Sequence, residues 1–230
     1  MKIGIIGAMD VEVQELISSM ENITEKNISS SVYYEGKLQN KNIVAAKCGV
    51  GKVHAAVCAQ TMILKYKPNI IINTGVAGSL NSKLDIGDLV ISDNVVQHDM
   101  DTSGLGDPIG FISGMNLVYI PCSKNLVKKL ESSAKTIEGT NAFVGTIASG
   151  DQFICSQEKK DYIVKHFNAL CTEMEGAAIG QVCYLNNTDF CIIRAISDKA
   201  DGSAHMDFPS FIKIATKKST QMINTFLKDL

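Results

Sequence analysis

The sequence predicts a single α/β domain of three layers, an αβα fold in which helices cover both faces of a central, twisted, mixed sheet. Four short apolar runs rich in β-branched residues are typical of strands buried on both faces of a sheet: residues 69–75, 88–92, 142–149 and 189–197. Segments with apolar residues at helical spacing separate these runs. No linker, repeat or low-complexity stretch interrupts the chain, so residues 1–230 are expected to form one domain.

The first part of the chain predicts a strand, a helix, a hairpin and a second helix. In chain order these are a strand within 3–9, a helix from 10 to 20, a hairpin of 32–38 and 42–48, and a helix within 49–66. Pro68 follows the second helix and should end it, because proline cannot continue the helical hydrogen bonding. The hairpin is the reason that the largely parallel sheet should be mixed.

The remaining helices are expected at 123–134, 156–167, 173–185 and 208–230. Ser123, Ser156 and Asp207 are suited to be N-caps, since their side chains can accept a hydrogen bond from the first helical turn. The one long irregular stretch is 97–117, QHDMDTSGLGDPIGFISGMNL, and loops of this length are usually functional or mobile. We therefore expect a lid or an interface there.

Composition favours small-molecule chemistry in the cytoplasm. Net charge is −2, from 22 basic and 24 acidic residues that are well mixed, so no basic surface for nucleic acid or for an anionic membrane is visible. Seven cysteines without a CxxC pair indicate reduced thiols rather than disulfides or a zinc site. Four histidines show no metal spacing. No apolar stretch is long enough for a signal peptide or a membrane span.

Ligands of open α/β sheets bind at the carboxyl ends of the parallel strands. Four segments at such ends should converge: Gly7 to Met9, Thr74 to Gly78, Ser149 to Phe153, and Ser197 with Asp198. Asp198, partly desolvated and beside a hydroxyl, would have a raised pKa and act as a general acid. An equally good interpretation is that it caps the following turn.

The only arginine, Arg194, lies near the acidic run EMEG, and its guanidinium fork suits a carboxylate or a phosphate. EMEG is expected to open a helix, on which Glu173 and Glu175 would point to nearly opposite sides, so that only one could face a ligand. Each glutamate could instead act only on the helix dipole. Glu12 would reach the same crevice or be an exposed acid early in its helix.

Glycine-rich segments carry a weaker signal. GVGK at 49–52 lacks the flanking residues of a phosphate-binding P-loop. NTGVAGSL at 73–80 could present backbone N–H groups to a polar ligand, or could be a tight turn from strand to helix. Neither segment identifies a ligand alone.

Together these segments resemble one family closely. The matching segments, in chain order, are MKIGIIGAM with Glu12, CGVGKVHAA, NTGVAGSL, SGDQFI, TEMEGAAI and RAISDKAD. They are the pattern of the 5′-methylthioadenosine/S-adenosylhomocysteine nucleosidases, within the nucleoside phosphorylase superfamily. The resemblance runs from residue 1 to about residue 230 in consistent order. It implies the nucleoside phosphorylase-like fold and hydrolysis of the N-glycosidic bond, which gives adenine and the thioribose.

The resemblance also implies roles for single residues. Asp198 would protonate adenine N7, with Ser197 orienting it. Glu12 would hold and activate the attacking water, with Arg194 nearby. The implied substrate-binding residues are Met9, Val50, Ala77, Gly78, Phe153, Ile154, Glu173, Met174, Glu175, Phe208 and Leu105. Among these, Glu175 would bind the ribose hydroxyls, Phe153 would stack on adenine, and the backbone of Ile154 would read the base edge.

The family further implies a homodimer without a metal or an organic cofactor. The 97–117 loop, including Leu105, would complete the 5′-thio pocket of the partner subunit together with Phe208. Two departures from the family stand out: Val76 lies where some members have serine, and the loop is short and lacks several aromatic residues.

Two other functions fit parts of the sequence. A purine nucleoside phosphorylase would use phosphate in place of water, but it needs several arginines and this chain has only Arg194. A nucleoside-binding protein without turnover would not need Glu12, Glu175 and Asp198 together. The sequence therefore favours the hydrolase.

Overall fold

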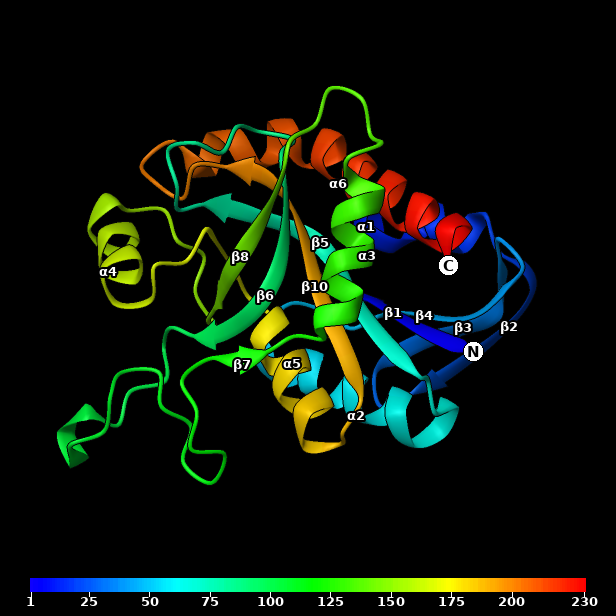
Figure 1. The fold of residues 1–230 in the computed structure, drawn as a ribbon, viewed down its shortest axis with the longest axis horizontal. Helices are drawn as coiled ribbons and strands as arrows, with labels where there is room; N and C mark the ends of the chain where they lie inside the picture. Colours follow the sequence, from blue (N-terminus) through cyan, green and yellow to red (C-terminus); the bar gives the residue numbers. More distant parts are fainter.

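The computed structural model describes residues 1–230, which build one continuous sheet with helices on both faces (Figure 1). The strands are β1 (Lys2–Gly7), β2 (Glu21–Ile28), β3 (Ser31–Leu38), β4 (Lys41–Lys47), β5 (Ile70–Ser79), β6 (Leu89–Gln97), β7 (Ile120–Pro121), β8 (Ala142–Ser149), β9 (Cys171–Glu173) and β10 (Asp189–Asp198). The helices are α1 (Asp10–Ser18), α2 (Lys52–Tyr66), α3 (Lys124–Ala134), α4 (Gln157–Phe167), α5 (Gly176–Leu185) and α6 (Ala204–Asp229), with a 3₁₀ turn η1 (Ser103–Leu105).

The sheet is mixed, as predicted, and one part of it closes on itself. β5 is the central strand and pairs in parallel with β1 and β10 and antiparallel with β9. From β10 the hydrogen bonding continues through β6 and β8 to β9, and so returns to β5. β4, β3 and β2 extend the open side beyond β1. Closure was not predicted, because hydrophobic pattern identifies strands but not their neighbours.

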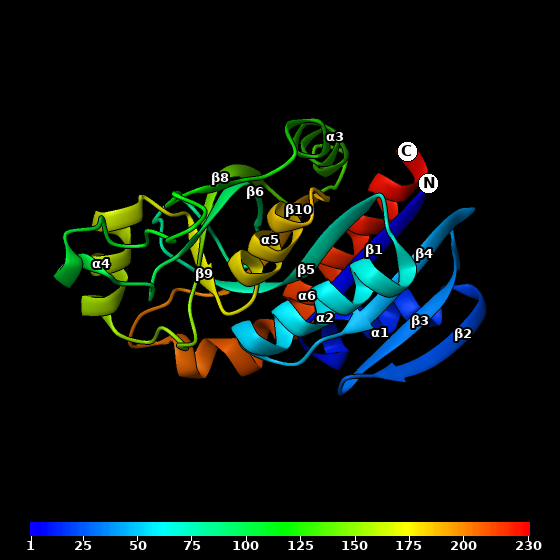
Figure 2. The same ribbon diagram turned by 90° about the horizontal axis from the view of Figure 1, so that it is seen from below.

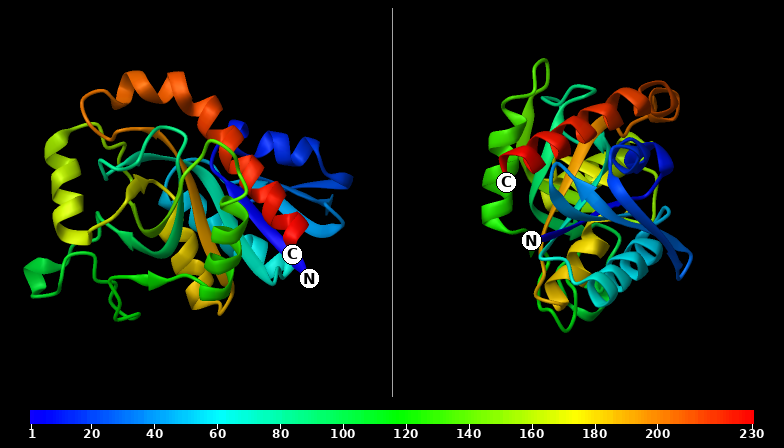
Figure 3. Two further views of the ribbon diagram at one scale, coloured as in Figure 1. Left: turned by 45° about the horizontal axis from the view of Figure 1, so that its top comes forward. Right: turned by 90° about the vertical axis from the view of Figure 1, so that its right-hand side faces the viewer.

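Two separate cores give the three predicted layers. α1, α3 and α6 pack on one face of the sheet over Leu16, Leu130 and Phe226, while α2 and α5 pack on the other face over Met62 and Ile179. Figures 2 and 3 show the sheet between these two groups of helices. α4 covers a third, smaller cluster at the closed end. The fold class predicted from the sequence is therefore confirmed.

Most predicted elements are present, and several have different ends. β5 and β6 are longer than expected, because both continue at their carboxyl ends beyond the predicted apolar runs. NTGVAGSL is therefore mostly strand, and the interpretation of it as a tight turn into a helix is wrong. β2 was missed entirely, because its sequence ENITEKNI is polar and its residues are mostly exposed at the sheet edge. An edge strand of this kind leaves no hydrophobic pattern to find.

Helix starts differ in two places that matter for the cavity. EMEG does not open a helix, since Glu173 ends β9 and α5 begins at Gly176. α6 begins at Ala204 after Ser203, so Asp207 lies inside its first turn and is not the N-cap. Ser156 caps α4 as predicted, with its hydroxyl accepting from the N–H of Lys159 at 3.3 Å. Ser123 occupies the cap position of α3 without a capping side-chain hydrogen bond.

No helix is both long enough and apolar enough to cross a membrane. All seven cysteines are free thiols, and only Cys155 is exposed. No group of three or more histidine, cysteine, aspartate or glutamate side chains is placed to hold a metal ion.

Candidate active site

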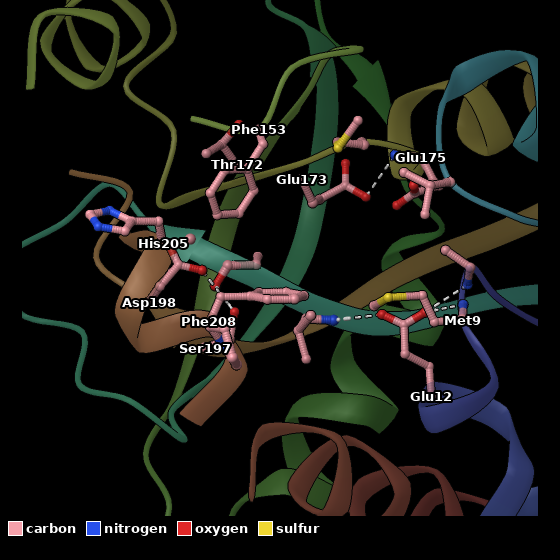
Figure 4. A pocket seen from close by; sticks show the side chains of 17 residues that line it. Met9, Glu12, Phe153, Thr172, Glu173, Glu175, Ser197, Asp198, His205 and Phe208 are labelled. Carbon is pink, nitrogen blue, oxygen red and sulfur yellow. Dashed lines mark hydrogen bonds between the residues drawn. The ribbon is translucent and has the colours of Figure 1, made fainter. Parts of the chain in front are cut away.

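A cavity of about 460 Å³ opens where the carboxyl ends of β1, β5 and β10 meet, within the range usual for small-molecule sites (Figure 4). The predicted convergence of strand ends is therefore found. The lining residues are Ala8, Met9, Glu12, Val50, Val76, Ala77, Gly78, Phe153, Thr172, Glu173, Met174, Glu175, Ser197, Asp198, His205, Phe208 and Pro209.

Glu12 is a buried carboxylate held by backbone donors. It lies in the first turn of α1 but is only 2% exposed, so the alternative of a solvated acid is wrong. Its Oε2 accepts from the N–H groups of Ala8 at 2.7 Å and Met9 at 2.9 Å, and its Oε1 accepts from Val76 N–H at 3.2 Å. Burial raises the pKa of Glu12, although Arg194 and these N–H groups act against it.

Arg194 lies behind the cavity wall rather than in it. The guanidinium is fully buried, donates to Asn73 Oδ1 at 2.6 Å and forms an ion pair with Glu173. Gly75, its cross-strand partner on β5, makes the room, because a Cβ there would overlap Arg194 Nη1 and Glu12 Oε1. The predicted position of Arg194 beside Glu12 is therefore found, but direct contact with a ligand in the cavity is not.

Glu173 accepts most of the hydrogen bonds around Arg194. Its carboxylate accepts from Arg194, from the hydroxyl of Ser149, and from the N–H groups of Glu175 at 3.1 Å and Gly176 at 2.8 Å. These donors occupy both oxygens. Glu173 thus borders the cavity, but its hydrogen-bonding capacity is used to join β8, β10 and the start of α5.

Glu175 is the carboxylate that remains available. It is 4% exposed; Oε1 accepts from Gly51 N–H at 2.9 Å, and Oε2 lies 3.6 Å from Arg194 Nη2. Burial, followed by the nearby Glu173, raises the pKa of Glu175 above its ordinary value. Residues 173–175 are not helical, so the predicted placement of the two glutamates on opposite sides of a helix is wrong. Both line the cavity, but only Glu175 keeps an oxygen without a hydrogen-bond donor.

Asp198 lies at the other end of the cavity, at the exit of β10. Its Oδ2 accepts from the hydroxyl of Ser197 at 2.9 Å and its Oδ1 from the N–H of Ala200 at 2.9 Å. The second bond caps the following turn, as one of the two interpretations predicted, and the role of a general acid stays a prediction. Burial raises the pKa of this carboxyl, against both hydrogen bonds, which lower it. A protonated Asp198 is what a general acid requires.

Aromatic and apolar side chains form the mouth. The ring centroids of Phe153 and Phe208 are 5.8 Å apart in an edge-to-face arrangement. Figure 4 shows these rings with His205 near Asp198, whereas Met9 lies near Glu12. The cavity therefore has an aromatic end that includes Asp198 and an end lined by Glu12 and Glu175.

Hydrogen bonds join the loops that follow β6 and β8 to the start of α2. Lys52 Nζ forms an ion pair with Asp99 at 2.7 Å, and the N–H of Lys52 donates to Asp151 Oδ1 at 2.7 Å. Asp151 N–H in turn donates to Asp99 Oδ2 at 2.9 Å. This cluster fixes the segment that carries Phe153 against the start of α2.

Three predicted site residues lie outside the cavity lining. Arg194 is behind the wall, as described. Ile154 is buried beside a smaller recess that adjoins the cavity and shares Gly78, Phe153 and Asp198 with it. Leu105 is 85% exposed on η1, on the loop that projects from the body between β6 and β7 (Figure 1).

Ala8 lies in the segment Gly7 to Met9 that was expected at the crevice, whereas Thr172, His205 and Pro209 were not predicted as lining residues. Thr172 carried a signal, since it is the first residue of the TEMEGAAI segment. His205 and Pro209 carried none, because the early start of α6 is what brings them to the cavity.

Known proteins resemble this chain over nearly its whole length. A model of the phosphorylase superfamily matches residues 2–228. A 5′-methylthioadenosine/S-adenosylhomocysteine nucleosidase of Staphylococcus aureus is 40% identical over 229 residues, which cover 99% of this chain and 100% of the relative. The Neisseria meningitidis nucleosidase of the same name, solved with methylthio-immucillin-A, has a TM-score of 0.96 at 37% identity and covers 100% and 99% of the two chains. A futalosine hydrolase of Helicobacter pylori has a TM-score of 0.94 at 35% identity, covering 100% and 98%.

The raised pKa of Asp198 predicts a stabilising variant. The pKa of this carboxyl is higher in the folded protein than in the unfolded chain, where it is about 3.9. The free energy of unfolding therefore falls as the pH rises above about 3.9, and the loss is complete above the pKa of the folded state. Asp198→Asn should therefore raise the melting temperature at pH 8, by about 2–4 °C for each kcal/mol recovered, and raise it less near pH 4. Thermal unfolding of both proteins at the two pH values checks this, and an equal or lower melting temperature at pH 8 contradicts it.

Proposed function

This chain belongs to the phosphorylase superfamily, and we propose that it hydrolyses the N-glycosidic bond of 5′-methylthioadenosine and S-adenosylhomocysteine, and also of 5′-deoxyadenosine. The products are adenine and the thioribose, or 5-deoxyribose from the last substrate. The observation that carries the proposal is one cavity with a buried carboxyl of raised pKa at one end and two further carboxylates at the other. The nucleosidases of Staphylococcus aureus and Neisseria meningitidis support the same reaction.

The base end supplies the proton. As the glycosidic bond breaks, negative charge grows on the base, and protonation of adenine N7 neutralises it. Asp198 is suited to this step because burial favours its protonated form, and Ser197 fixes the carboxyl orientation. Phe153 would stack on the base, and the backbone of Ile154 in the adjoining recess would read its edge.

The acidic end supports the sugar. Positive charge grows on the anomeric carbon as the bond breaks, and Glu12 and Glu175 lie where they would stabilise it. Glu12 would take a proton from the attacking water. Glu175 has an oxygen free for the ribose hydroxyls, and Met9 and Met174 would pack on the sugar. Val76 offers no hydroxyl here, and its N–H holds Glu12.

The electrostatics favour water over phosphate as the nucleophile. No lysine or arginine lines the cavity, and the one guanidinium is buried behind it with its charge directed to Glu173 and Asn73. A phosphate dianion would instead meet Glu12 and Glu175. Phosphorolysis would require cations that this wall does not offer.

We also propose a homodimer, in which the 97–117 loop completes the 5′-thio pocket of the partner subunit. Exposure of Leu105 on a loop that projects from the body supports this arrangement, and Phe208 stands at the open side of the cavity. The free cysteines suit a cytoplasmic enzyme. Methionine salvage and nucleoside catabolism are the processes that this activity would serve.

Adenine release from 5′-methylthioadenosine tests the reaction. We expect equal turnover in buffers with and without phosphate, with thioribose and no sugar phosphate as the second product. Turnover only in the presence of phosphate would identify a phosphorylase. A folded sample that binds adenine but shows no turnover in either buffer would identify a binding protein.

Asp198→Asn should abolish the acid step while the pocket shape is retained. Because general acid catalysis typically contributes about 10²–10⁴-fold, kcat should fall by that factor with little change in affinity for the substrate. Single-turnover kinetics with a separate binding measurement distinguish the two quantities. A kcat near that of the unmodified enzyme would remove Asp198 from the acid role.

Leu105 tests the partner contribution. Leu105→Ser should raise KM for 5′-methylthioadenosine several-fold and leave the affinity for adenine unchanged, because adenine does not reach the 5′ end. Light scattering of the same variant checks that it remains dimeric. An unchanged KM in a dimeric sample would exclude Leu105 from the pocket.

A further inference from the structure

Residues 151–153, which follow β8, carry Phe153 to the mouth of the cavity with few bonds to hold them. All three are exposed and belong to no helix or strand. The Phe153 side chain is 47% exposed, and the ring that it packs against is that of Phe208. The main chain of 151–153 makes a single hydrogen bond within the protein, from Asp151 N–H to Asp99 Oδ2 at 2.9 Å. The position of the Phe153 ring therefore depends on Asp99.

Asp99 is itself held by an ion pair that is largely shielded from water. Its Oδ1 lies 2.7 Å from Lys52 Nζ, and the side chains of Asp99 and Lys52 are only 15% and 20% exposed. Lys52 Nζ also donates to Gln97 Oε1 at 3.1 Å. Burial would raise the pKa of Asp99, but Lys52 and the N–H of Asp151 outweigh burial and lower it. Asp99 is therefore a carboxylate at neutral pH, with one oxygen for Lys52 and one for Asp151.

The chain passes close to Asp99 at a glycine. A Cβ at Gly150 would overlap the His98 ring and lie 3.1 Å from Asp99 Cγ, so a side chain there would push the segment away. Beyond it, Asp151 Oδ1 accepts from the N–H of Lys52 at 2.7 Å, at the start of α2, where the N-cap residue has no side chain. A carboxylate is favourable at a helix N-terminus. Asp151 is thus held between Asp99 and α2.

The same helix start also holds a carboxylate from the other end of the cavity. Gly51 N–H donates to Glu175 Oε1 at 2.9 Å, and the next N–H, that of Lys52, donates to Asp151. The GVGK segment at 49–52 therefore binds two carboxylates of this chain through successive N–H groups. In this way α2 joins the segment that carries Phe153 to the side chain that lies at the ribose end.

We propose that Asp99 is a positioning residue for the base: by fixing the main chain at Asp151, it holds the Phe153 ring where a purine can stack on it. Asp99 does not line the cavity, so it acts on the base through Phe153 and not by contact. Stacking depends on ring orientation, and a ring that is fixed beforehand loses less freedom when the base binds. This inference rests on the proposed function, because it takes a purine stacked on Phe153 as the bound state.

Binding of adenine to Asp99→Asn, measured by calorimetry, tests the proposal. Asparagine retains the shape and removes the charge that pairs with Lys52, so we expect about 3- to 10-fold weaker binding of adenine. KM for 5′-methylthioadenosine should rise by a similar factor, whereas kcat should change less, because neither Asp198 nor Glu12 is bonded to Asp99.

Glu35→Gln is a matched control. It breaks an ion pair with Lys2 that has the same length, 2.7 Å, but lies away from the cavity. This variant should bind adenine as the unmodified enzyme does. Equal binding of adenine to Asp99→Asn and to the unmodified enzyme would overturn the proposal, and so would an equal loss in Asp99→Asn and Glu35→Gln.

A double-variant cycle with Phe153→Ala shows whether Asp99 acts through that ring. In the Phe153→Ala background, Asp99→Asn should weaken adenine binding by less than about 2-fold, because the group that Asp99 positions is absent. A purely structural role would give the same loss with and without the ring, and that result would also overturn the proposal.

Lys52→Met provides a second variant if Asp99→Asn does not fold. It removes the ammonium that holds Asp99 and retains the N–H of Lys52 that binds Asp151, so we expect a smaller loss of adenine affinity in the same direction. Unchanged affinity in this variant would overturn the proposal. Failure of the unmodified enzyme to bind adenine at all would count against the proposed function, not against Asp99 alone.

Discussion

The structure depends on one buried cation among three carboxylates. Arg194 is fully buried in the closed part of the sheet, and Glu173, Glu175 and Glu12 all act on its charge. Burying ions is costly unless they are paired and hydrogen-bonded, and Glu173 has both kinds of partner. Arg194 therefore interacts most strongly with Glu173 and stabilises the fold. Its attraction for Glu12 and Glu175 is weaker than the cost of burying them, so burial is the main cause of their raised pKa values.

The position of Arg194 makes the two ends of the cavity different. Glu12 and Glu175 lie beside the buried cation at one end, whereas Asp198 lies away from it at the other, and burial raises the pKa of all three carboxyls. The closed ring of strands brings β9 back to β5 and so places residues 172–175 in the wall of the cavity that Asp198 also lines.

The sequence predicted most of the strands, most of the helices and the convergence of the strand ends, because buried runs and helical spacing are local signals. It predicted Glu12, Glu175 and Asp198 as site residues through their motifs. It predicted Arg194 beside Glu12, but not that the guanidinium lies behind the cavity wall, which only the pairing with Gly75 shows. Thr172 and His205 depend on strand closure and on the start of α6, which no local pattern reveals.

Gly75 has a consequence for how this protein tolerates change. The space left by its missing side chain holds Arg194 Nη1 and Glu12 Oε1, so one position serves both the packing of the interior and the electrostatics of the cavity. Most enzymes can lose active-site groups and still fold. Here a replacement at position 75 would be eliminated as a folding defect before its effect on chemistry could be selected. Selection for correct folding thus also preserves the surroundings of Glu12.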